Sequence, residues 1–217
     1  MDGNARWARK NSFSPKKGYL EGLNKIYEVI DICIDSKIKY LTLYTLSTEN
    51  IKRSSINLIY EIMYNNFSKI YKKLSDNKKI RINIIGDKKN LPIKIIEILS
   101  KLESATKNNN TIILNIAFNY GSINELLFAI KKIISLSKNN QLKYNENLIF
   151  DNLYLSNVPE PDILIRTGGY KRLSNFLLLQ LRYTELFFTD TLWPDISNNE
   201  INSIFNEYRK LDRKYGL

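Results

Sequence analysis

Apolar residues recur every three or four positions in five segments of the chain, which is the spacing of an amphipathic helix. The two longest segments are Lys16–Ser36 and Ser55–Leu74. A proline or a serine begins two of the shorter ones, as is typical of helix N-termini. The pattern predicts helices over both long segments and over Pro92–Lys107, Ser122–Ser137 and Asn198–Arg213.

Short apolar runs alternate with these helices and predict strands. They cover Tyr40–Leu46, Ile80–Ile85, Thr111–Phe118, Asp162–Arg166 and Leu186–Thr189. The first run is apolar enough for a strand buried on both faces. Strands alternating with helices predict an α/β fold with a mostly parallel central sheet and helices on both faces. Because no linker or internal repeat interrupts the chain, we expect a single domain over residues 1–217.

Polar residues directly follow most of the predicted strands. In parallel sheets, ligands bind beyond the carboxyl ends of the strands. The residues at these positions are Ser47–Asn50, Asp87, Asn119 and Arg166–Gly169, and Asp2–Arg6 has the same loop character. The Asn- and Lys-rich stretches Lys107–Asn110 and Ser137–Asn147 predict surface loops.

The chain of 217 residues contains no histidine and one cysteine. This composition excludes Ser-His-Asp and Cys-His catalysis and every histidine-ligated metal site. Cys33 lies among apolar residues of a predicted helix, where we expect it to pack as a small hydrophobic side chain. Chemistry is therefore left to carboxylates, amides, hydroxyls, Arg and Lys, or to a hard metal ion bound by oxygen.

The net charge of +11 allows two explanations. One is an anionic partner such as nucleic acid, phosphates or a membrane surface. The other, which we favour, is an overall excess of scattered lysines that form no long run. No stretch reaches the roughly 18–20 apolar residues of a membrane span, and no signal peptide pattern is present, so we expect a cytoplasmic protein.

Arginines and hydroxyls form the candidate binding set. They are Arg6, Arg53, Arg166 and Arg172 with Ser47, Thr48 and Ser174. Guanidinium groups bind phosphate oxygens through paired hydrogen bonds. Asp2 and Glu185 are candidate ligands of one metal ion, and Gly3, Gly168 and Gly169 are expected to leave backbone N–H groups free for an anion. The set suits two diphosphates and Mg²⁺, and the lack of a Walker-type loop disfavours a nucleoside triphosphate.

A series of motifs in consistent order resembles the signatures of the cis-prenyltransferase family. They are Met1–Ala8, Leu41–Asn50, Ile85–Asp87, Leu114–Gly121, Pro161–Gly169, Arg172–Leu178 and Glu185–Pro194. The resemblance spans essentially the whole chain. It implies an enzyme that joins isopentenyl diphosphate units onto an allylic, farnesyl-type diphosphate with Mg²⁺, giving a long polyprenyl diphosphate such as the bacterial cell-wall lipid carrier precursor.

The resemblance also implies roles for single residues. Asp2 would hold Mg²⁺ and assist departure of the diphosphate, and Asn50 would lie near the proton lost from isopentenyl diphosphate. Glu185 would contribute to the metal site, in this family across a dimer interface. Trp7 packs either beside the substrate or in the core. The implied substrate-binding residues are Gly3, Asn4, Ala5, Arg6, Trp7, Tyr19, Ser47, Thr48, Glu49, Ile51, Arg53, Arg166, Arg172, Leu173 and Ser174.

Four further expectations concern surfaces and partners. An apolar tunnel beside the sheet would house the growing chain, with the apolar face of Ser55–Leu74 as a candidate wall. The apolar and aromatic segment Glu185–Trp193 predicts a homodimer interface. Product release implies transient contact with the inner face of the membrane, and no nucleic acid is expected as a partner.

The chain departs from the family pattern at several positions. Tyr19 replaces a histidine, Ala5 a glycine and Tyr170 an acidic residue. An arginine is missing near Pro15, and Ile51 and Leu179 replace tryptophans. Family members also carry a short strand ahead of the first motif. We therefore expect translation to start upstream of Met1, so that residues 1–217 lack the first strand of the domain.

Two other functions remain as alternatives. One is a noncatalytic partner subunit of the same fold, but such subunits tend to lose the first aspartate, and Asp2 is present. The other is a basic nucleic-acid-binding protein. That function needs aromatic residues interleaved with a basic stripe, and the sequence has no RNA-binding signature.

Overall fold

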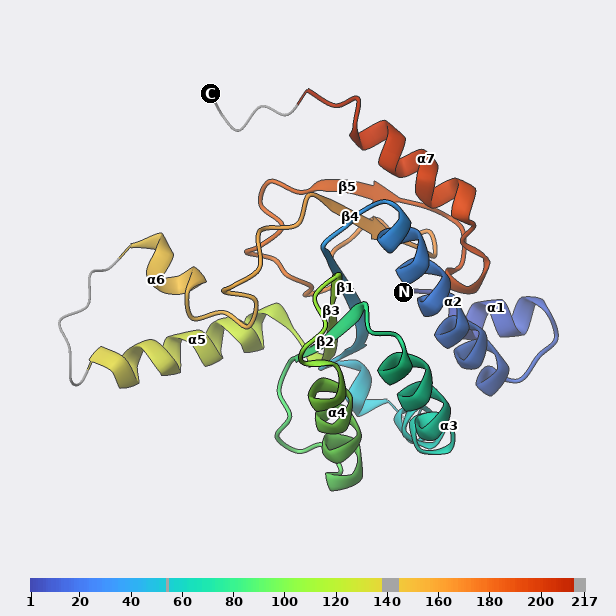
Figure 1. Cartoon of the computed structure of the whole chain (residues 1–217), viewed down its shortest axis with the longest axis horizontal. Helices are drawn as coiled ribbons and strands as arrows, with labels where there is room; N and C mark the ends of the chain where they lie inside the picture. The colour runs from blue at the N-terminus through green and yellow to red at the C-terminus, as the bar shows by residue number, and fades with distance from the viewer. Residues whose placement is uncertain (54, 138–144, 213–217) are drawn as a thin grey trace.

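The computed structural model describes residues 1–53, 55–137 and 145–212 (Figure 1). Its elements are α1 (Asn4–Lys10), α2 (Pro15–Asp35), β1 (Tyr40–Ser47), η1 (Asn50–Lys52), α3 (Ile56–Asp76), β2 (Ile80–Ile85), α4 (Ile93–Thr106), β3 (Ile112–Tyr120), α5 (Ser122–Ser137), α6 (Glu146–Phe150), β4 (Ile163–Arg166), β5 (Glu185–Phe188), η2 (Trp193–Asp195) and α7 (Asn198–Tyr208). The predicted strands and long helices are confirmed. The last helix ends at Tyr208, earlier than predicted.

Two short helices, α1 and α6, were not predicted. The interpretation of Asp2–Arg6 as a loop is wrong from Asn4 onward, because α1 begins there. The first turn of α1 packs closely on α2 because Gly18 and Gly22 lack side chains: a Cβ at either would collide with Asn4. The predicted loop Ser137–Asn147 is wrong at its end, where α6 begins, and its residues 138–144 lie outside the described residues.

Every strand pairing in the described chain is parallel, as predicted, but the strands form two sheets. The order is β1-β3-β2 in one sheet and β4-β5 in the other. Strand β3 is paired on both edges, and its residues Ile112 and Ala117 are fully buried. Strand β1 is an edge strand with only Leu43 and Leu46 buried, so the prediction of burial on both faces is wrong.

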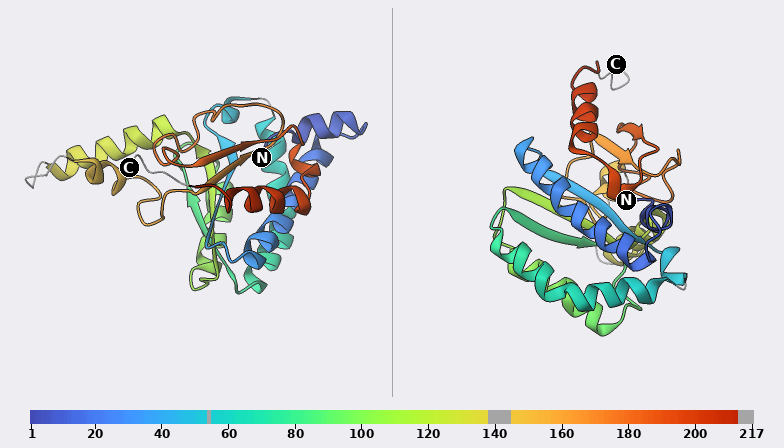
Figure 2. Two further views of the ribbon diagram at one scale, coloured as in Figure 1. Left: turned by 90° about the horizontal axis from the view of Figure 1, so that it is seen from above. Right: turned by 90° about the vertical axis from the view of Figure 1, so that its right-hand side faces the viewer.

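Helices lie on both sides of the strands. In Figure 1, α2 and α3 lie to the right of the three-stranded sheet, while α5 and α6 lie to its left. Figure 2 shows α5 with α6 projecting at one end of the molecule and α1 lying at the other. Within the described ranges, no helix combines the length and hydropathy that a bilayer crossing requires.

A cavity of about 850 Å³ lies between β1 and β4. Residues Tyr40–Leu43 line one side and Ile163–Ile165 the other, and α2 and α7 add Val29 and Phe205. Among the described residues, none from α3 lines this cavity; the apolar face of α3, a candidate tunnel wall, packs against the main core instead.

Cys33 belongs to the main core, as predicted. Its side chain is buried with Val29 and Ile30 of the same helix. Burial raises the pKa of the Cys33 thiol to about 12, so the thiol stays protonated. A protonated, buried thiol is a packing group and not a nucleophile.

Candidate active site at the strand ends

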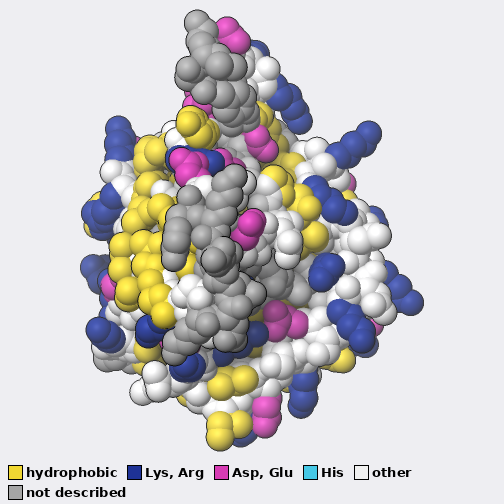
Figure 3. Space-filling view, turned by 90° about the vertical axis from the view of Figure 1, so that its left-hand side faces the viewer, with side chains coloured by type: hydrophobic (Ala, Val, Ile, Leu, Met, Phe, Trp, Pro, Cys, Tyr) yellow, Lys and Arg dark blue, Asp and Glu magenta, His cyan; other side chains and the backbone are white. Residues whose placement is uncertain are grey.

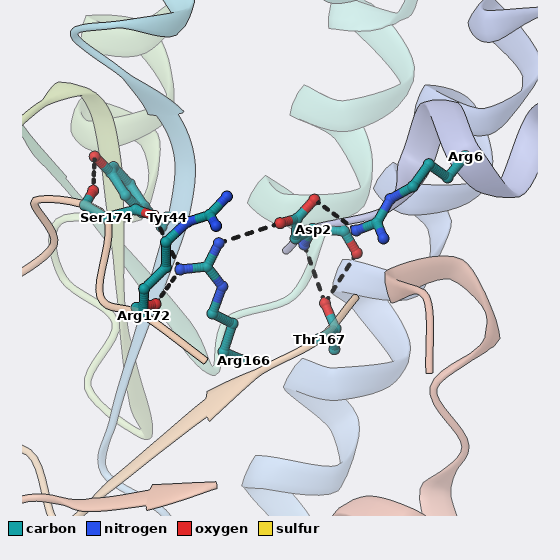
Figure 4. A network of polar contacts seen from close by, with 7 residues as sticks. All are labelled: Asp2, Arg6, Tyr44, Arg166, Thr167, Arg172 and Ser174. Carbon is teal, nitrogen blue, oxygen red and sulfur yellow. Dashed lines mark hydrogen bonds and ion pairs between the residues drawn. The ribbon is translucent and has the colours of Figure 1, made fainter. Parts of the chain in front are cut away.

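Asp2 lies between two guanidinium groups beyond the end of β4 (Figure 4). Its Oδ1 is 3.2 Å from Arg6 Nη2 and its Oδ2 is 3.3 Å from Arg166 Nη2. The hydroxyl of Thr167 accepts a hydrogen bond from the Asp2 N–H and donates one to the Asp2 carbonyl, both at 3.0 Å. The Trp193 N–H donates to the same carbonyl at 3.0 Å. These bonds hold the backbone of Asp2 beside the end of β4.

Arg166 links Asp2 to the loop that follows β4. Its Nη1 donates to the Ser174 hydroxyl at 2.9 Å and to the carbonyl of Arg172. The Arg172 guanidinium has no carboxylate partner within the described part of the chain. Asp2 therefore pairs with only two of the three arginines in this region, and the surplus of positive charge favours an anionic ligand.

The loop carrying Ser174 is held in an unusual backbone conformation. Ser174, Asn175 and Leu177 have φ angles of 51°, 61° and 45°. A non-glycine residue in this region costs on the order of 1–3 kcal/mol, and such strain persists only where surrounding contacts enforce it. Here the Ser122 N–H donates to the Asn175 carbonyl at 2.8 Å, and the Asn175 amide donates to Glu49 at 3.0 Å. The enforced conformation brings the Ser174 hydroxyl to Arg166.

The ends of β1 and β3 meet at the same loop. The Thr48 N–H donates to the Tyr120 carbonyl at 3.0 Å, and the Asn50 N–H donates to the Ser47 hydroxyl at 3.1 Å. Burial alone would raise the pKa of Glu49, but hydrogen bonds, the largest of them from Asn175, outweigh it and lower this pKa. The carboxylate of Glu49 therefore stays charged and holds the loops together.

Tyr44 is a member of this network that the sequence did not point to, and Thr167 was expected only as part of the strand-end range Arg166–Gly169, without a role of its own. The Tyr44 hydroxyl donates to the Tyr120 carbonyl at 3.1 Å, and its ring stacks on Phe176 at 4.5 Å between centroids. Burial raises the pKa of Tyr44, so its hydroxyl remains a donor. A tyrosine inside an apolar strand gives no signal of such a role. Thr167 follows a strand end directly, and that position is a usable signal.

The prediction that Gly168 and Gly169 offer free N–H groups is wrong. The Gly168 N–H donates to the Thr191 carbonyl at 2.8 Å, and that of Gly169 donates to Thr189 at 2.9 Å. Gly168 provides space instead: a Cβ there would lie 2.5 Å from Arg6 Nη2 and 3.2 Å from the Asp2 Cβ, and its φ of 88° disfavours any other residue. The glycine is needed for the close approach of the ion pair.

Glu185 does not join Asp2 within one chain. It begins β5 opposite Ile163, whereas Arg166 pairs with Phe188 at the other end of the same ladder. Three residues of strand span about 10 Å, so the two carboxylates lie at opposite ends of β4 and β5. No group of three metal-ligating side chains occurs among the described residues. The two carboxylates therefore do not meet within one chain, and the metal site shared by Asp2 and Glu185 across a dimer interface stays a prediction.

The other predicted residues lie around this cluster in different environments. Gly3 precedes α1, Ala5 is exposed, and Tyr19 is half-buried in α2. Trp7 stacks on Phe13 at 5.7 Å and donates to Asp195 at 2.5 Å. Trp7 is thus a half-buried residue of the α1 surface and not part of the core.

Three more of the predicted residues make no hydrogen bond or ion pair to these arginines within the described chain. Ile51 packs against the main core, and Leu173 packs against a second apolar cluster that contains Leu177. Arg53 is exposed at the end of η1. These side chains lie around the loops of the site, and Asp2 with its arginines forms the polar centre.

The fold and this centre define an α/β protein with a cluster of arginines around an aspartate at the carboxyl ends of parallel strands. The family described as putative undecaprenyl diphosphate synthase matches residues 1–216. The chain belongs to this family, as its motifs predicted, and is a cis-prenyltransferase.

Relatives and solved structures agree with this assignment. An isoprenyl transferase of Fusobacterium nucleatum is 38% identical over 218 residues, covering 100% of this chain and 93% of the relative. A tritrans,polycis-undecaprenyl-diphosphate synthase (geranylgeranyl-diphosphate specific) of Pyrococcus abyssi is also 38% identical, covering 100% of this chain and 84% of the relative.

Two crystal structures are similar along nearly the whole chain. A probable undecaprenyl diphosphate synthase of Campylobacter jejuni has 32% identity and a TM-score of 0.82, covering 91% of this chain and 92% of that one. Lavandulyl diphosphate synthase of Lavandula x intermedia, in complex with dimethylallyl diphosphate, has 29% identity and a TM-score of 0.93, covering 100% and 95%.

Proposed function

We propose that this chain condenses isopentenyl diphosphate repeatedly onto an allylic diphosphate of the farnesyl type and releases a long polyprenyl diphosphate. The bacterial cell-wall lipid carrier precursor is such a product. The observation that carries the proposal is the pairing of one aspartate with two arginines, beside a third arginine without a carboxylate. The names of two similar proteins also mention allylic diphosphates, geranylgeranyl and dimethylallyl.

The arginines supply what the chemistry requires. When the allylic diphosphate departs, negative charge develops on its oxygens, and donors already in place there lower the barrier. Arg6 and Arg166 present such donors around Asp2, and Ser174 orients Arg166 through its hydroxyl. Arg172 and Arg166 would bind the diphosphate of isopentenyl diphosphate. Asn50 follows the end of β1, from where it would face the proton that this substrate loses.

Mg²⁺ fits the donor set around Asp2. This ion is commonly held by one or two carboxylates together with substrate phosphate oxygens and water. Asp2 is the carboxylate of the cluster, and its side chain is 37% exposed, so it is accessible to such a complex. When bound, Mg²⁺ would supply further charge stabilisation for the departing diphosphate. Asp2 would hold it, while the arginines would turn from Asp2 to the phosphate oxygens.

A homodimer is part of the proposal because Glu185 and Asp2 lie too far apart in one chain. Glu185 of a second copy would supply the second carboxylate. Apolar side chains are exposed on two elements that such a contact would cover: Leu186 of β5 is 42% exposed, and Ile134 of α5 is 54% exposed. Figure 3 shows hydrophobic side chains gathered on the face from which α5 projects. Light scattering at micromolar concentration tests this, and a monomer contradicts it.

The activity is tested with labelled isopentenyl diphosphate and Mg²⁺. Farnesyl, geranylgeranyl and dimethylallyl diphosphate serve as separate primers, and the lipid product is sized after each reaction. We expect long products with at least one primer and none in EDTA. The absence of any product with all three primers overturns the proposal and favours the noncatalytic subunit. Full activity in EDTA overturns the assignment of Mg²⁺.

A further inference from the structure

The ring of Tyr170 lies among the three guanidinium groups of the site. Its centroid is 4.2 Å from the Cζ of Arg172, 4.9 Å from that of Arg6 and 5.9 Å from that of Arg166. All three distances fall within the roughly 6 Å range of cation–π attraction. The three arginines come from different parts of the chain, namely α1, the end of β4 and the loop after it.

Three like charges this close together repel one another, and one carboxylate cannot pair with all of them. Asp2 pairs with Arg6 and Arg166 only. Arg172, the arginine nearest to Tyr170, lacks a carboxylate among the described residues. The aromatic ring therefore supplies the attraction that the single aspartate does not.

The direction from which a ring attracts a guanidinium group decides which of its N–H groups remain available to a ligand. An aromatic face attracts the cation through its quadrupole and leaves the N–H groups in the guanidinium plane available. Phosphate oxygens bind to these same N–H groups in paired hydrogen bonds. A ring can thus gather arginines without occupying the donors that a diphosphate needs. Tyr170 is 43% exposed, so its ring borders the open side of the cluster.

We propose that Tyr170 is a positioning residue that holds Arg6, Arg166 and Arg172 together as a preformed cradle for a diphosphate group. This inference rests on the proposed function for the identity of the substrate. It concerns the aromatic ring and not the phenolic hydroxyl. Removing the ring is expected to weaken diphosphate binding while leaving the chemical step intact.

The test compares Tyr170→Leu, which removes the ring, with Tyr170→Phe, which keeps it. Tyr64→Leu is the matched control, because Tyr64 is a partly exposed tyrosine of α3 whose ring faces the Lys94 ammonium at 5.7 Å. Binding of inorganic diphosphate to the full chain is measured by calorimetry. The KM for isopentenyl diphosphate and kcat are measured by turnover. Urea unfolding of each variant shows that the fold is retained.

We expect Tyr170→Leu to raise both the Kd for inorganic diphosphate and the KM about tenfold, the size that two or three exposed cation–π contacts give. We expect kcat to change by less than about threefold, because Arg6 and Arg166, which face the departing group, are still held by their ion pairs with Asp2. Tyr170→Phe and Tyr64→Leu are expected to match the original chain. Equal Kd values for Tyr170→Leu and the original chain overturn the inference, as does a Tyr170→Phe variant as weak as Tyr170→Leu.

Failure of this inference can be told apart from failure of the proposed function. If the original chain makes no prenyl product but Tyr170→Leu still weakens diphosphate binding, the role of Tyr170 stands and the proposed activity falls. If the original chain is active and the variant binds diphosphate equally well, only the role of Tyr170 falls. If the original chain does not bind inorganic diphosphate at all, the cradle is wrong.

Discussion

Glu125 and Asp2 stand at the centres of two polar networks with opposite properties. Glu125 is 1% exposed and accepts hydrogen bonds from the Tyr120 hydroxyl, the Gln180 amide at 3.0 Å and the Tyr154 N–H at 2.8 Å. All three donors are neutral. Burial, followed by the charge of Glu125, raises the pKa of Tyr120, so that its hydroxyl stays a donor.

Asp2, in contrast, is half-exposed and contacts charged donors. Its partners Arg6 and Arg166 belong to a group of three arginines whose charge it does not balance. A closed network of neutral donors fixes the packing of the elements that contribute to it. An open network with surplus charge keeps capacity for an anion. Glu125 is therefore expected to stabilise the fold, and Asp2 to take part in ligand binding. Substitution of each residue tests its role.

The largest expected effect is on turnover, from Asp2→Asn. This change keeps the shape of the side chain and removes its charge. Asn is a weaker ligand for the Mg²⁺ that Asp2 would hold, and loss of one group that stabilises developing charge typically lowers kcat about 100- to 1000-fold. The free energy of unfolding should fall by less than about 1 kcal/mol, because exposed ion pairs contribute little. Steady-state kinetics and urea unfolding measure the two quantities.

The control for this variant is Asp35→Asn, which changes an exposed aspartate at the end of α2. We expect it to leave both quantities unchanged. If Asp2→Asn keeps kcat within threefold of the original chain, Asp2 does not act on the departing group. If it unfolds the protein, Asp2 resembles Glu125, and the comparison fails.

The next effect is on stability, from Glu125→Ala. The substitution leaves two buried donors and one partly buried donor without an acceptor, and each buried group costs about 1–3 kcal/mol, so the free energy of unfolding should fall by at least about 2 kcal/mol. Glu125→Gln keeps an acceptor and should cost less. At a temperature where the variants remain folded, the KM for isopentenyl diphosphate should stay unchanged. An undiminished stability of Glu125→Ala would mean that this network does not maintain the fold.

The parts of the fold that could be predicted are those where periodicity and burial agree. Strand β2 has the predicted bounds and helix α4 lies within one residue of them at each end, because apolar residues occupy their buried positions in the expected period. Helix α1 could not be predicted, since it is short and mostly polar. It also depends on contact with Gly18 and Gly22, which belong to a different helix, α2. The split into two sheets depends on which strands pair with one another, and the periodicity of apolar residues gives no information on strand pairing.

Within the site, the rule about strand ends selected Arg166, while Ser174 and Asp2 were selected as a hydroxyl and a carboxylate suited to a diphosphate and a metal ion. It could not predict the N–H groups of Gly168 and Gly169, because their acceptors follow β5 and depend on its register. The same register separates Glu185 from Asp2. The aromatic contact of Tyr170 was also beyond prediction, since it depends on side-chain directions of three separate elements.

A third effect is on the KM values for the two diphosphate substrates, which the arginines of the site are expected to bind in separate pockets. Arg172→Ala should raise the KM for isopentenyl diphosphate about 10- to 150-fold, because a charged hydrogen-bonding group contributes about 1.5–3 kcal/mol. Arg166→Ala should have a larger effect, since Arg166 also contacts Asp2 and Ser174. Arg172→Lys keeps the charge without the paired donors and should lie in between. Equal increases in KM for both substrates would argue against two separate diphosphate pockets.

The smallest expected effect is on the free energy of unfolding, and it depends on how firmly the backbone of Asp2 is held in comparison with that of Glu125. Glu125 lies within α5, whereas the backbone of Asp2 is anchored to Thr167 and Trp193. Beside this anchor, β1 and β4 face the cavity of about 850 Å³, and neither has a second strand partner among the described residues. The buried Gln180 Oε1 also lacks a partner within the described chain, and Gln180 lines the same cavity.

A strand placed in this cavity is therefore expected to stabilise the protein. Because Asp2 is bound at the carboxyl end of β4, a segment added ahead of Met1 would run parallel to β1 and β4. Five or six alternating apolar residues span about 17–20 Å, a typical strand. Each new hydrogen bond contributes about 0.5–1.5 kcal/mol, and ordering the segment offsets part of the gain. We expect the free energy of unfolding to rise by about 1–3 kcal/mol and kcat to rise as Asp2 becomes better fixed. A control extension of equal length with alternating prolines cannot pair and should change neither quantity. If both extensions behave alike, the cavity does not accept a strand, and the anchoring of Asp2 is already sufficient.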